Sequence, residues 1–458
     1  MERIGSAATV TAVLTFSFML SNTATARTLY VTVDGTDSGS CGAQASACRS
    51  ISQGLENAVA GDTILVGAGR YGNISGSPAY TGVGDEHPQQ LNLDRTTGCI
   101  VCIDKRVSIY SLHGPSVTVI EGSALTPSEA TVLIHSDGVN FGAPGRGFTI
   151  TGGTAYGVDL DQDTSAFSIG LIMKKNVSVG GNVDLGDATG FAFLGLSLTD
   201  SHCPDPSCVN TASITFSENE SSDNPDSGFN FTQGLFYGGP ILVENNYARG
   251  AGVGFNVPGG TQQMIGTASS SNLVRLTGNV AQHNGLGFYA LYPGSMTYNT
   301  AASNSQAGFE VVASPIAFQG NTAVGNSGPG AIVQFFDNGS QPPTAVGFQS
   351  FTQNNFYGND RHRPALSISV GQLPQVSYNP GASAHCGVLN LGILAQGFED
   401  VANPPIPAPL NANGNFWGGT HGPSATGAAD AVGGKCDQRG GKTTVTSFKS
   451  TGFVITTH

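Results

Sequence analysis

The densest run of side chains able to do chemistry is Asp360-Arg361-His362-Arg363, directly after Asn359. A histidine accepts or donates a proton near neutral pH, and the neighbouring Asp360 could orient the His362 ring. An arginine at this place could hold an anionic group of a substrate. We predict catalytic roles for Asp360, Arg361 and His362 and a substrate-binding role for Arg363. The alternative is a polar turn.

A second cluster is acidic and consists of Glu218, Glu220, Asp223 and Asp226. Carboxylates are hard oxygen ligands, and this density could hold a calcium ion. Strand alternation would place Glu218 and Glu220 on one face. We predict that Glu218, Glu220 and Asp223 bind metal, with calcium as the candidate cofactor. An acidic, solvated edge is the alternative, because the spacing matches no calcium-loop motif.

A third group alternates along the chain as Asp159, Asp161 and Asp163. In a strand these carboxylates would share one face, as a hydrolase or metal site requires; in a loop they could be inert. Lys174 and Lys175 follow and could supply a base. Adjacent strand residues point oppositely, so only one of these lysines could face a groove.

Aromatic side chains could stack on sugar rings. Phe288 belongs to a Gly-Phe repeat and is expected in the core, so Tyr289 should point outward, and we predict that Tyr289 binds substrate. The sequence contains no Gly-x-Ser-x-Gly, phosphate-loop or His-Glu-x-x-His motif.

Composition excludes several classes of protein. Glycine is 65 of 458 residues and charged residues are only 11%, which excludes a coiled coil or solvated helical bundle. The net charge of −13 argues against a nucleic-acid partner, because phosphate binding needs clustered Lys and Arg.

The first 26 residues have the pattern of a signal peptide, with Arg3, an apolar stretch and an Ala-Thr-Ala cleavage site at 24–26. We therefore expect a secreted protein, extracellular or periplasmic, with no membrane span after cleavage. An even number of cysteines in an exported chain favours disulfides. We pair them as Cys41 with Cys48, Cys99 with Cys102, Cys203 with Cys208, and Cys386 with Cys436.

Asparagine recurs a few residues before a Gly-Phe pair through the middle of the chain, with Gly-Ala in place of Gly-Phe after Asn321 and no such pair after Asn354. Its instances begin at Asn182, Asn219, Asn246, Asn279, Asn299, Asn321 and Asn354. Short apolar alternations predict strands around each instance, with Asn, Gly and Ser as turn residues. Two or three strands in each period of about twenty to thirty residues indicate one coil of a solenoid, with the asparagines stacked in columns. A sandwich would not produce this recurring pattern.

The two ends differ from the repeat. Apolar residues at helical spacing over 51–59 predict a short helix that covers the first coil. We expect one domain over 27–458, with coils clearest at 182–359 and a closing coil at about 411–458. The Pro-rich stretch 403–409 is interpreted as a surface loop.

Three features resemble secreted right-handed parallel β-helix proteins of the pectate-lyase-like superfamily. They are the N-terminal segment ACRSISQGLENAVAGDTILVGAGRYG, the Asn repeats and the C-terminal segment NGNFWGGTHGP. The resemblance spans roughly residues 28–450 and implies an all-β, single-stranded right-handed parallel β-helix with a substrate groove on one face. Tyr357-Gly358 with Asp360 and His362 is similar to the Tyr-Gly-x-Asp-x-His stretch of β-helix uronan epimerases, with Arg361 in place of Pro.

The resemblance implies a carbohydrate-active protein with a polysaccharide or cell-surface glycan as partner. We predict a polysaccharide lyase or uronan epimerase acting on an acidic polysaccharide. Two alternatives remain, a non-catalytic surface or scaffold protein and a glycoside hydrolase on a neutral glycan.

Overall fold

The computed structural model describes most of the chain with gaps. The described ranges are 25–72, 85–86, 99–122, 130–153, 156–161, 175–194, 213–232, 240–257, 274–291, 294–313, 317–337, 345–346, 348–360, 386–394, 408–424, 429–437 and 441–453. The predicted signal peptide lies outside them except for residues 25–26. Within these ranges, no helix has the length and apolar run needed to cross a membrane.

Nearly all the described elements belong to three long sheets. The first sheet contains β1 (Thr28–Val31), β2 (Thr63–Val66), β5 (Ser108–Ser111), β8 (Asn140–Phe141), β11 (Val177–Gly180), β14 (Ile214–Ser217), β17 (Ile241–Glu244), β20 (Val274–Thr277), β23 (Ser295–Thr297), β26 (Ala317–Gln319) and β30 (Ser350–Thr352). The second sheet contains β4 (Cys99–Ile103), β7 (Ala130–Ile134), β10 (Tyr156–Asp161), β13 (Thr189–Leu194), β16 (Ser227–Thr232), β19 (Val253–Val257), β22 (Leu286–Leu291), β25 (Phe309–Ala313), β28 (Ala331–Asp337), β29 (Ala345–Val346) and β32 (Val388–Leu394). The third sheet contains β3 (Gly69–Gly72), β6 (Thr118–Glu121), β9 (Thr149–Thr151), β12 (Val183–Leu185), β15 (Glu220–Ser222), β18 (Tyr247–Arg249), β21 (Val280–Gln282), β24 (Thr300–Ala302), β27 (Thr322–Val324), β31 (Asn355–Tyr357), β34 (Asn415–Phe416) and β36 (Phe448–Lys449).

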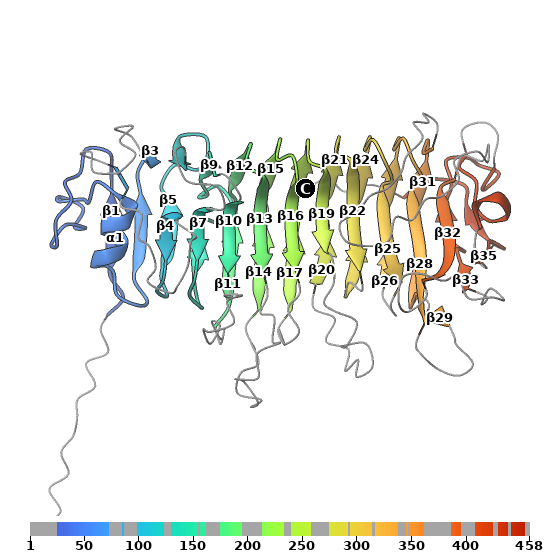
Figure 1. The fold of residues 1–458 in the computed structure, drawn as a ribbon, viewed down its shortest axis with the longest axis horizontal. Helices are drawn as coiled ribbons and strands as arrows, with labels where there is room; N and C mark the ends of the chain where they lie inside the picture. The colour runs from blue at the N-terminus through green and yellow to red at the C-terminus, as the bar shows by residue number, and fades with distance from the viewer. Residues whose placement is uncertain are drawn as a thin grey trace, which may run out of the picture.

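Each coil contributes one strand to each sheet, and each strand pairs in parallel with its counterpart in the next coil. The described exception is the antiparallel pair of β28 and β29. The molecule is a right-handed parallel β-helix, elongated along the axis on which the coils stack (Figure 1). This confirms the fold expected from the repeat.

The predicted N-terminal helix is α1 (Ile51–Asn57), and it contacts the first strands of the rod (Figure 1). Ser50 is its N-cap and accepts a hydrogen bond from the amide of Gln53. Ile51 and Leu55 are buried, so the helix covers the apolar interior of the first coil. A solenoid needs such a cover because its terminal coil has no neighbour on one side.

Two asparagine ladders run inside the coils. The second consists of Asn284, Asn304, Asn326 and Asn359, and Asp187 and Asn224 occupy the equivalent positions in earlier coils. In the first, the Nδ2 of Asn279 donates to Oδ1 of Asn299 at 3.0 Å, and Asn299 donates in the same way to Asn321 at 3.1 Å. Each backbone amide donates to the same acceptor as its side chain. The columns of asparagine predicted from the sequence are confirmed. Members of the first ladder are Asn182, Asn219, Asn246, Asn279, Asn299, Asn321, Asn354 and Asn415.

The phenylalanines of the Gly-Phe repeat form a stack in the interior. Successive ring centroids lie 4.7–5.0 Å apart with nearly parallel planes. The stack consists of Phe191, Phe229, Phe255, Phe288 and Phe309. Phe288 is therefore core, as predicted, and the strand residue after each stacked Phe points away from the interior.

The C-terminal segment adds further coils. β34 and β36 continue the third sheet, while β33 (Ala408–Asn411) and β35 (Gly441–Thr444) form a separate parallel pair. A short 3-10 helix, η3 (Gly434–Cys436), carries one cysteine of the last disulfide. The predicted disulfides Cys41–Cys48, Cys99–Cys102 and Cys386–Cys436 are confirmed. Cys203 and Cys208 lie outside the described residues.

Candidate functional site

Of the predicted catalytic cluster, only Asp360 lies within the described residues; Arg361, His362 and Arg363 lie outside them. Asp360 is 8% exposed and has a left-handed backbone with φ of 53°. Its Oδ2 accepts a hydrogen bond from the amide of Cys386 at 3.2 Å. Asp360 therefore ties the corner after Asn359 to the segment leading into β32.

The predicted calcium ligands are arranged differently from the expectation. Glu218 and Asp223 occupy left-handed corners on either side of β15, so Glu218 is not a strand residue and does not share a strand face with Glu220. The guanidinium of Arg249 lies 4.0 Å from Glu220 and 3.9 Å from Asp223. A cation of the protein itself thus neighbours two of the three carboxylates.

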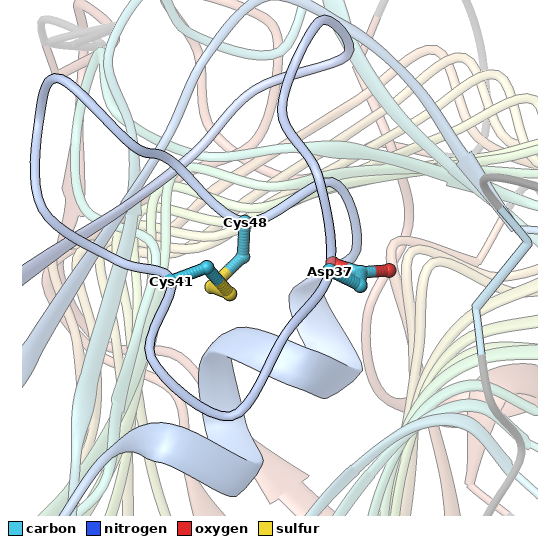
Figure 2. A group of neighbouring side chains, drawn as sticks. All are labelled: Asp37, Cys41 and Cys48. Atoms are coloured by element: carbon cyan, nitrogen blue, oxygen red, sulfur yellow. A yellow bond between two sulfur atoms is a disulfide. The ribbon is translucent and has the colours of Figure 1, made fainter.

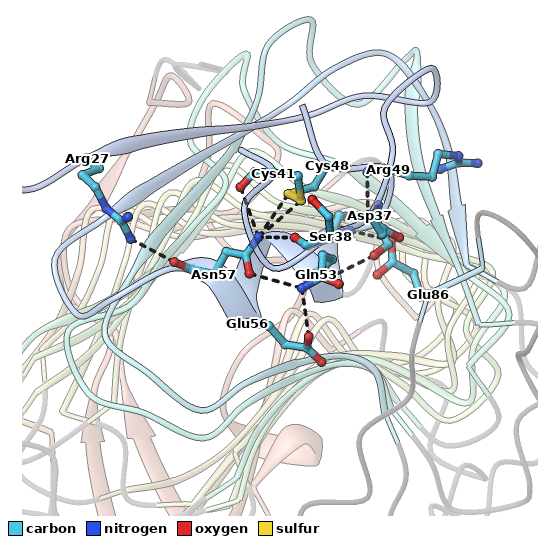
Figure 3. Close-up of a disulfide and its surroundings, with 12 residues drawn as sticks. Arg27, Asp37, Ser38, Cys41, Cys48, Arg49, Gln53, Glu56, Asn57 and Glu86 are labelled. Atoms are coloured by element: carbon cyan, nitrogen blue, oxygen red, sulfur yellow. Dashed lines mark hydrogen bonds between the residues drawn. A yellow bond between two sulfur atoms is a disulfide. The ribbon is translucent and has the colours of Figure 1, made fainter. Parts of the chain in front are cut away.

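Another group brings potential metal ligands together within the described ranges, namely Asp37 with Cys41 and Cys48 (Figure 2). Both sulfurs are in a disulfide, so neither has a thiolate to offer a metal. Oδ1 of Asp37 accepts hydrogen bonds from the amides of Arg49 and Ser50 (Figure 3). This group organises the N-terminal loop.

The third predicted group falls on the second sheet. Asp159 and Asp161 both fall in β10, and the side chain of Asp161 lies outside what the structure describes. Asp159 is only 5% exposed. Asp163 and Lys174 lie outside the described residues, and Lys175 is exposed, with its amide bonded to Asp137.

The outer face of the second sheet carries a row of polar side chains. We call it the outer row and define it as the residue after the glycine-aromatic pair in four successive coils: Asn230, Asn256, Tyr289 and Glu310. These residues are register partners on β16, β19, β22 and β25, so neighbours are about 4.8 Å apart along the rod. Tyr289 points away from the interior, as predicted.

Half of the outer row is nevertheless covered, because Tyr289 and Glu310 are buried while Asn230 and Asn256 are partly exposed. Tyr289 is 2% exposed and belongs to an apolar cluster with Leu286, Ile332 and Cys386. Because the amide of Cys386 binds Asp360, the predicted catalytic run starts beside the same cluster that contains Tyr289. The structure therefore brings these two predicted sites to one face of the rod, but Tyr289 is not on an open surface.

Glu310 is a buried titratable group of this face, and the structure shifts its pKa toward neutrality. It is 4% exposed, and burial alone raises its pKa from 4.5 to about 7. Its Oε1 lies 3.4 Å from the Nε2 of Gln334, which donates to it from β28. Its Oε2 is buried and has no hydrogen-bond partner among the described residues. A carboxyl group with a pKa near neutrality can serve as general acid or base.

Two amides extend the row from Tyr289. The Nδ2 of Asn256 donates to Oδ1 of Asn230 at 3.3 Å. The Oδ1 of Asn256 is buried without a hydrogen-bond partner in the described part of the chain. Unsatisfied acceptors at Asn256 and Glu310 flank Tyr289 and offer a ligand two hydrogen-bonding positions.

A separate carboxyl pair lies inside the coil. Asp187 occupies the second asparagine ladder, where its amide donates to Oδ1 of Asn224, and Asp184 faces it from β12. Burial and the charge of Asp187 hold the pKa of Asp184 well above its usual range. Burial also raises the pKa of Asp187 to about 6, although hydrogen bonds oppose this shift. Two neighbouring buried carboxyl groups with raised pKa values favour a state in which they share one proton.

Sequence reasoning missed Glu310, although a signal for it was present. The position after each Gly-Phe pair reads Ala192, Asn230, Asn256, Tyr289 and Glu310. Among these residues the sequence predicts a substrate-binding role for Tyr289 alone, because an aromatic ring can stack on a sugar. Aligning the same position in every coil would have identified the row, since equivalent positions of a solenoid become spatial neighbours.

Comparison of the chain with family models and with curated proteins finds no match. Among solved structures, a rhamnogalacturonan lyase matches with a TM-score of 0.42 and 13% identity, covering 73% of this chain and 81% of that one. The Dettilon tailspike protein matches with a TM-score of 0.28 and 11% identity, covering 70% and 68% respectively. Similarity at this level carries nothing about activity, and the fold assignment rests on the strand registers.

Proposed function

We propose that the chain is a secreted β-helix protein that acts on an acidic polysaccharide as a lyase or uronan epimerase. The observation that carries the proposal is the outer row, in which amide, phenol and carboxyl groups follow one another at coil spacing. A polysaccharide lying along the rod would meet Asn230 and Asn256 at successive coils, about 4.8 Å apart, and would reach Tyr289 and Glu310 once the surface over them opens. Three disulfides support an oxidising, extracellular location.

An acidic protein must avoid repelling an acidic polymer, and its net charge is −13. Glu310 adds no full negative charge below neutral pH, because its pKa is about 7. The predicted anion-binding groups Arg361 and Arg363 follow Asp360, which lies at the edge of this face. A uronate carboxylate held by an arginine has a more acidic neighbouring C–H bond, which both elimination and epimerisation require.

The test is incubation of the secreted protein with a panel of uronate polymers. Elimination is followed by ultraviolet absorbance of the new double bond, and epimerisation by nuclear magnetic resonance of the uronate stereochemistry. We expect one of these signals with at least one polymer. Absence of both signals across the panel would contradict the proposal.

A non-catalytic surface or scaffold protein is the second candidate. The observation that favours it is the near-complete burial of Tyr289 and Glu310. Polysaccharide binding without turnover, unchanged by Asp360→Ala and His362→Ala, would support this candidate over an enzyme.

Asp159 and Glu310, two described buried carboxyl groups of the second sheet, do not form the pair that a glycoside hydrolase uses. The two residues share the register of this sheet but are separated by five strand steps, about 24 Å. Paired glycosidase carboxylates lie roughly 5–9.5 Å apart.

A further inference from the structure

We propose that Glu310 is the proton-transferring residue of this protein, acting on a sugar C–H bond next to a uronate carboxylate, with Tyr289 as its neighbour in the site. The inference rests on the proposed function and goes beyond it by naming the base. Lyases of the resembled superfamily often use Lys or Arg for this step, and the described outer row holds a carboxyl group instead.

The geometry gives Glu310 one held oxygen and one available oxygen. Gln334 donates to Oε1 at 3.4 Å from β28, while Oε2 has no hydrogen-bond partner in the part of the chain that the structure describes. A single anchoring bond orients the carboxyl group and leaves the second oxygen for a substrate proton. β22, β25 and β28, which carry Tyr289, Glu310 and Gln334, lie side by side (Figure 1).

The surroundings explain why this carboxyl group would be a competent base. Its register partners are Tyr289 on β22 and Ile332 on β28. Tyr289 is the titratable partner, Gln334 and Ile332 do not titrate, and no charged group contributes to the raised pKa. Burial therefore poises Glu310 between its two protonation states near neutral pH.

Both elimination and epimerisation proceed by proton transfer and need no oxidant, reductant or co-substrate. In elimination, the carboxylate of Glu310 takes the proton from C5 of the uronate, and the C–H electron pair forms the C4=C5 double bond. The C4–O bond breaks, and the leaving oxygen takes a proton from a hydroxyl group such as that of Tyr289. In epimerisation the C4–O bond stays intact, and the carbanion at C5 takes a proton on its opposite face from a hydroxyl group such as that of Tyr289. Glu310 then releases its proton to water, and the phenolate takes one from water. Because Tyr289 and Glu310 are buried in this conformation, the surface over these two residues must open to admit the sugar.

The experiment compares Glu310→Gln, Glu310→Asp and Tyr289→Phe with the wild-type chain on the most reactive uronate polymer. Glu310→Gln keeps the shape and removes the base, so we expect turnover to fall by about 10²–10⁴-fold with polymer binding retained. Glu310→Asp should restore part of the rate. Wild-type turnover should rise with pH through about 7, and Glu310→Gln should lose this dependence. The control is Glu244→Gln, at the end of β17 on the first sheet.

The outcomes separate the two claims. A wild-type chain without turnover on any polymer would overturn the proposed function and this inference with it. An active wild type whose Glu310→Gln variant keeps its rate and its pH profile would overturn the inference alone. A merely structural Glu310 would show this second pattern together with a raised melting temperature at pH 8, because the variant no longer buries a charge.

Discussion

Burial in the interior of the coil raises the pKa values of two carboxyl groups, those of Asp184 and Asp187. The later members of the second ladder, such as Asn304 and Asn326, use a side-chain amide to donate to the next coil. Asp187 occupies an equivalent position but offers a carboxyl group, which can donate only when protonated.

The pair predicts an unusual dependence of stability on pH. The pKa of Asp187 is about 6 in the folded protein against a usual 3.8, so the folded chain holds a proton that the unfolded chain has released. The free energy of unfolding contributed by this group therefore falls as pH rises from 3.8 through about 6 and stays lower above that range.

Asp187→Asn should remove this penalty. The new amide can donate to Asn224, so we expect the free energy of unfolding at pH 8 to rise by on the order of 2 kcal/mol, with a smaller gain at pH 4. Urea denaturation at the two pH values measures the difference. Asp226→Asn, at an exposed position, is the control. An equal effect at both pH values would refute the shared-proton interpretation.

At the scale of elements, the ladders and the glycines beside them set how closely coils stack. Each ladder asparagine satisfies backbone groups of neighbouring coils; Asn299, for example, also donates to the carbonyl of Leu276 at 2.9 Å. Corner backbone that would otherwise be buried without partners is thereby hydrogen-bonded.

Asn299→Ala should be strongly destabilising. It leaves the backbone and side-chain donors of Asn279 without their acceptor in a fully buried place. We expect a loss of about 2–4 kcal/mol in the free energy of unfolding, measured by denaturant titration. The control is Asn140→Ala, because Asn140 is partly exposed and its side chain makes one bond, to Ser108, at 3.0 Å. Similar losses for the two variants would argue against the ladder's importance.

Gly287→Ala tests the close approach of backbone to the second ladder. A methyl group there would lie 2.4 Å from the carbonyl oxygen of Gly308 and 2.9 Å from the Nδ2 of Asn304. We expect a loss of about 1–3 kcal/mol, because neighbouring coils must move apart. Gly39→Ala, which meets nothing within 4 Å, should be neutral by the same thermal-melt measurement. A neutral Gly287→Ala would show that the coils can adjust freely.

At the scale of the whole molecule, a rod of stacked coils contacts itself only between neighbours, so its ends decide how it opens. At one end, Glu86 accepts hydrogen bonds from the amides of Ile51 and Ser52 and holds α1 over the first coil. At the other, the Cys386–Cys436 disulfide joins the start of β32 to η3.

Replacing Cys386 and Cys436 together by alanine should loosen the C-terminal coils. Their disulfide closes 50 residues, which corresponds to about 4 kcal/mol of chain entropy. Hydrogen exchange of β32 and β35 should accelerate, while β13 and β16 keep their protection. The control pair is Cys99 and Cys102, separated by 3 residues, with about half that entropy. Uniform acceleration along the rod would show that unfolding is not local.

The sequence by itself determined the coil. The spacing of Asn182 through Asn354, the Gly-Phe pairs and the cysteine pairs are local patterns, and strand alternation and turn chemistry translate them directly into a parallel β-helix with inward phenylalanines. For the candidate site, the sequence predicted that Tyr289 points away from the interior, but it did not predict that Glu310 and Asn256 lie beside Tyr289.

Only the tertiary structure decided which polar groups meet. Equivalent positions on successive coils lie 20 to 61 residues apart, because loops of unequal length separate them. Glu310 beside Tyr289 and Arg249 beside Glu220 therefore follow from strand register. The raised pKa of Glu310 likewise arises from burial of the outer face. Burial is a property of the assembled rod, because packing on that face removes water from a residue whose sequence neighbours alone would leave it solvated.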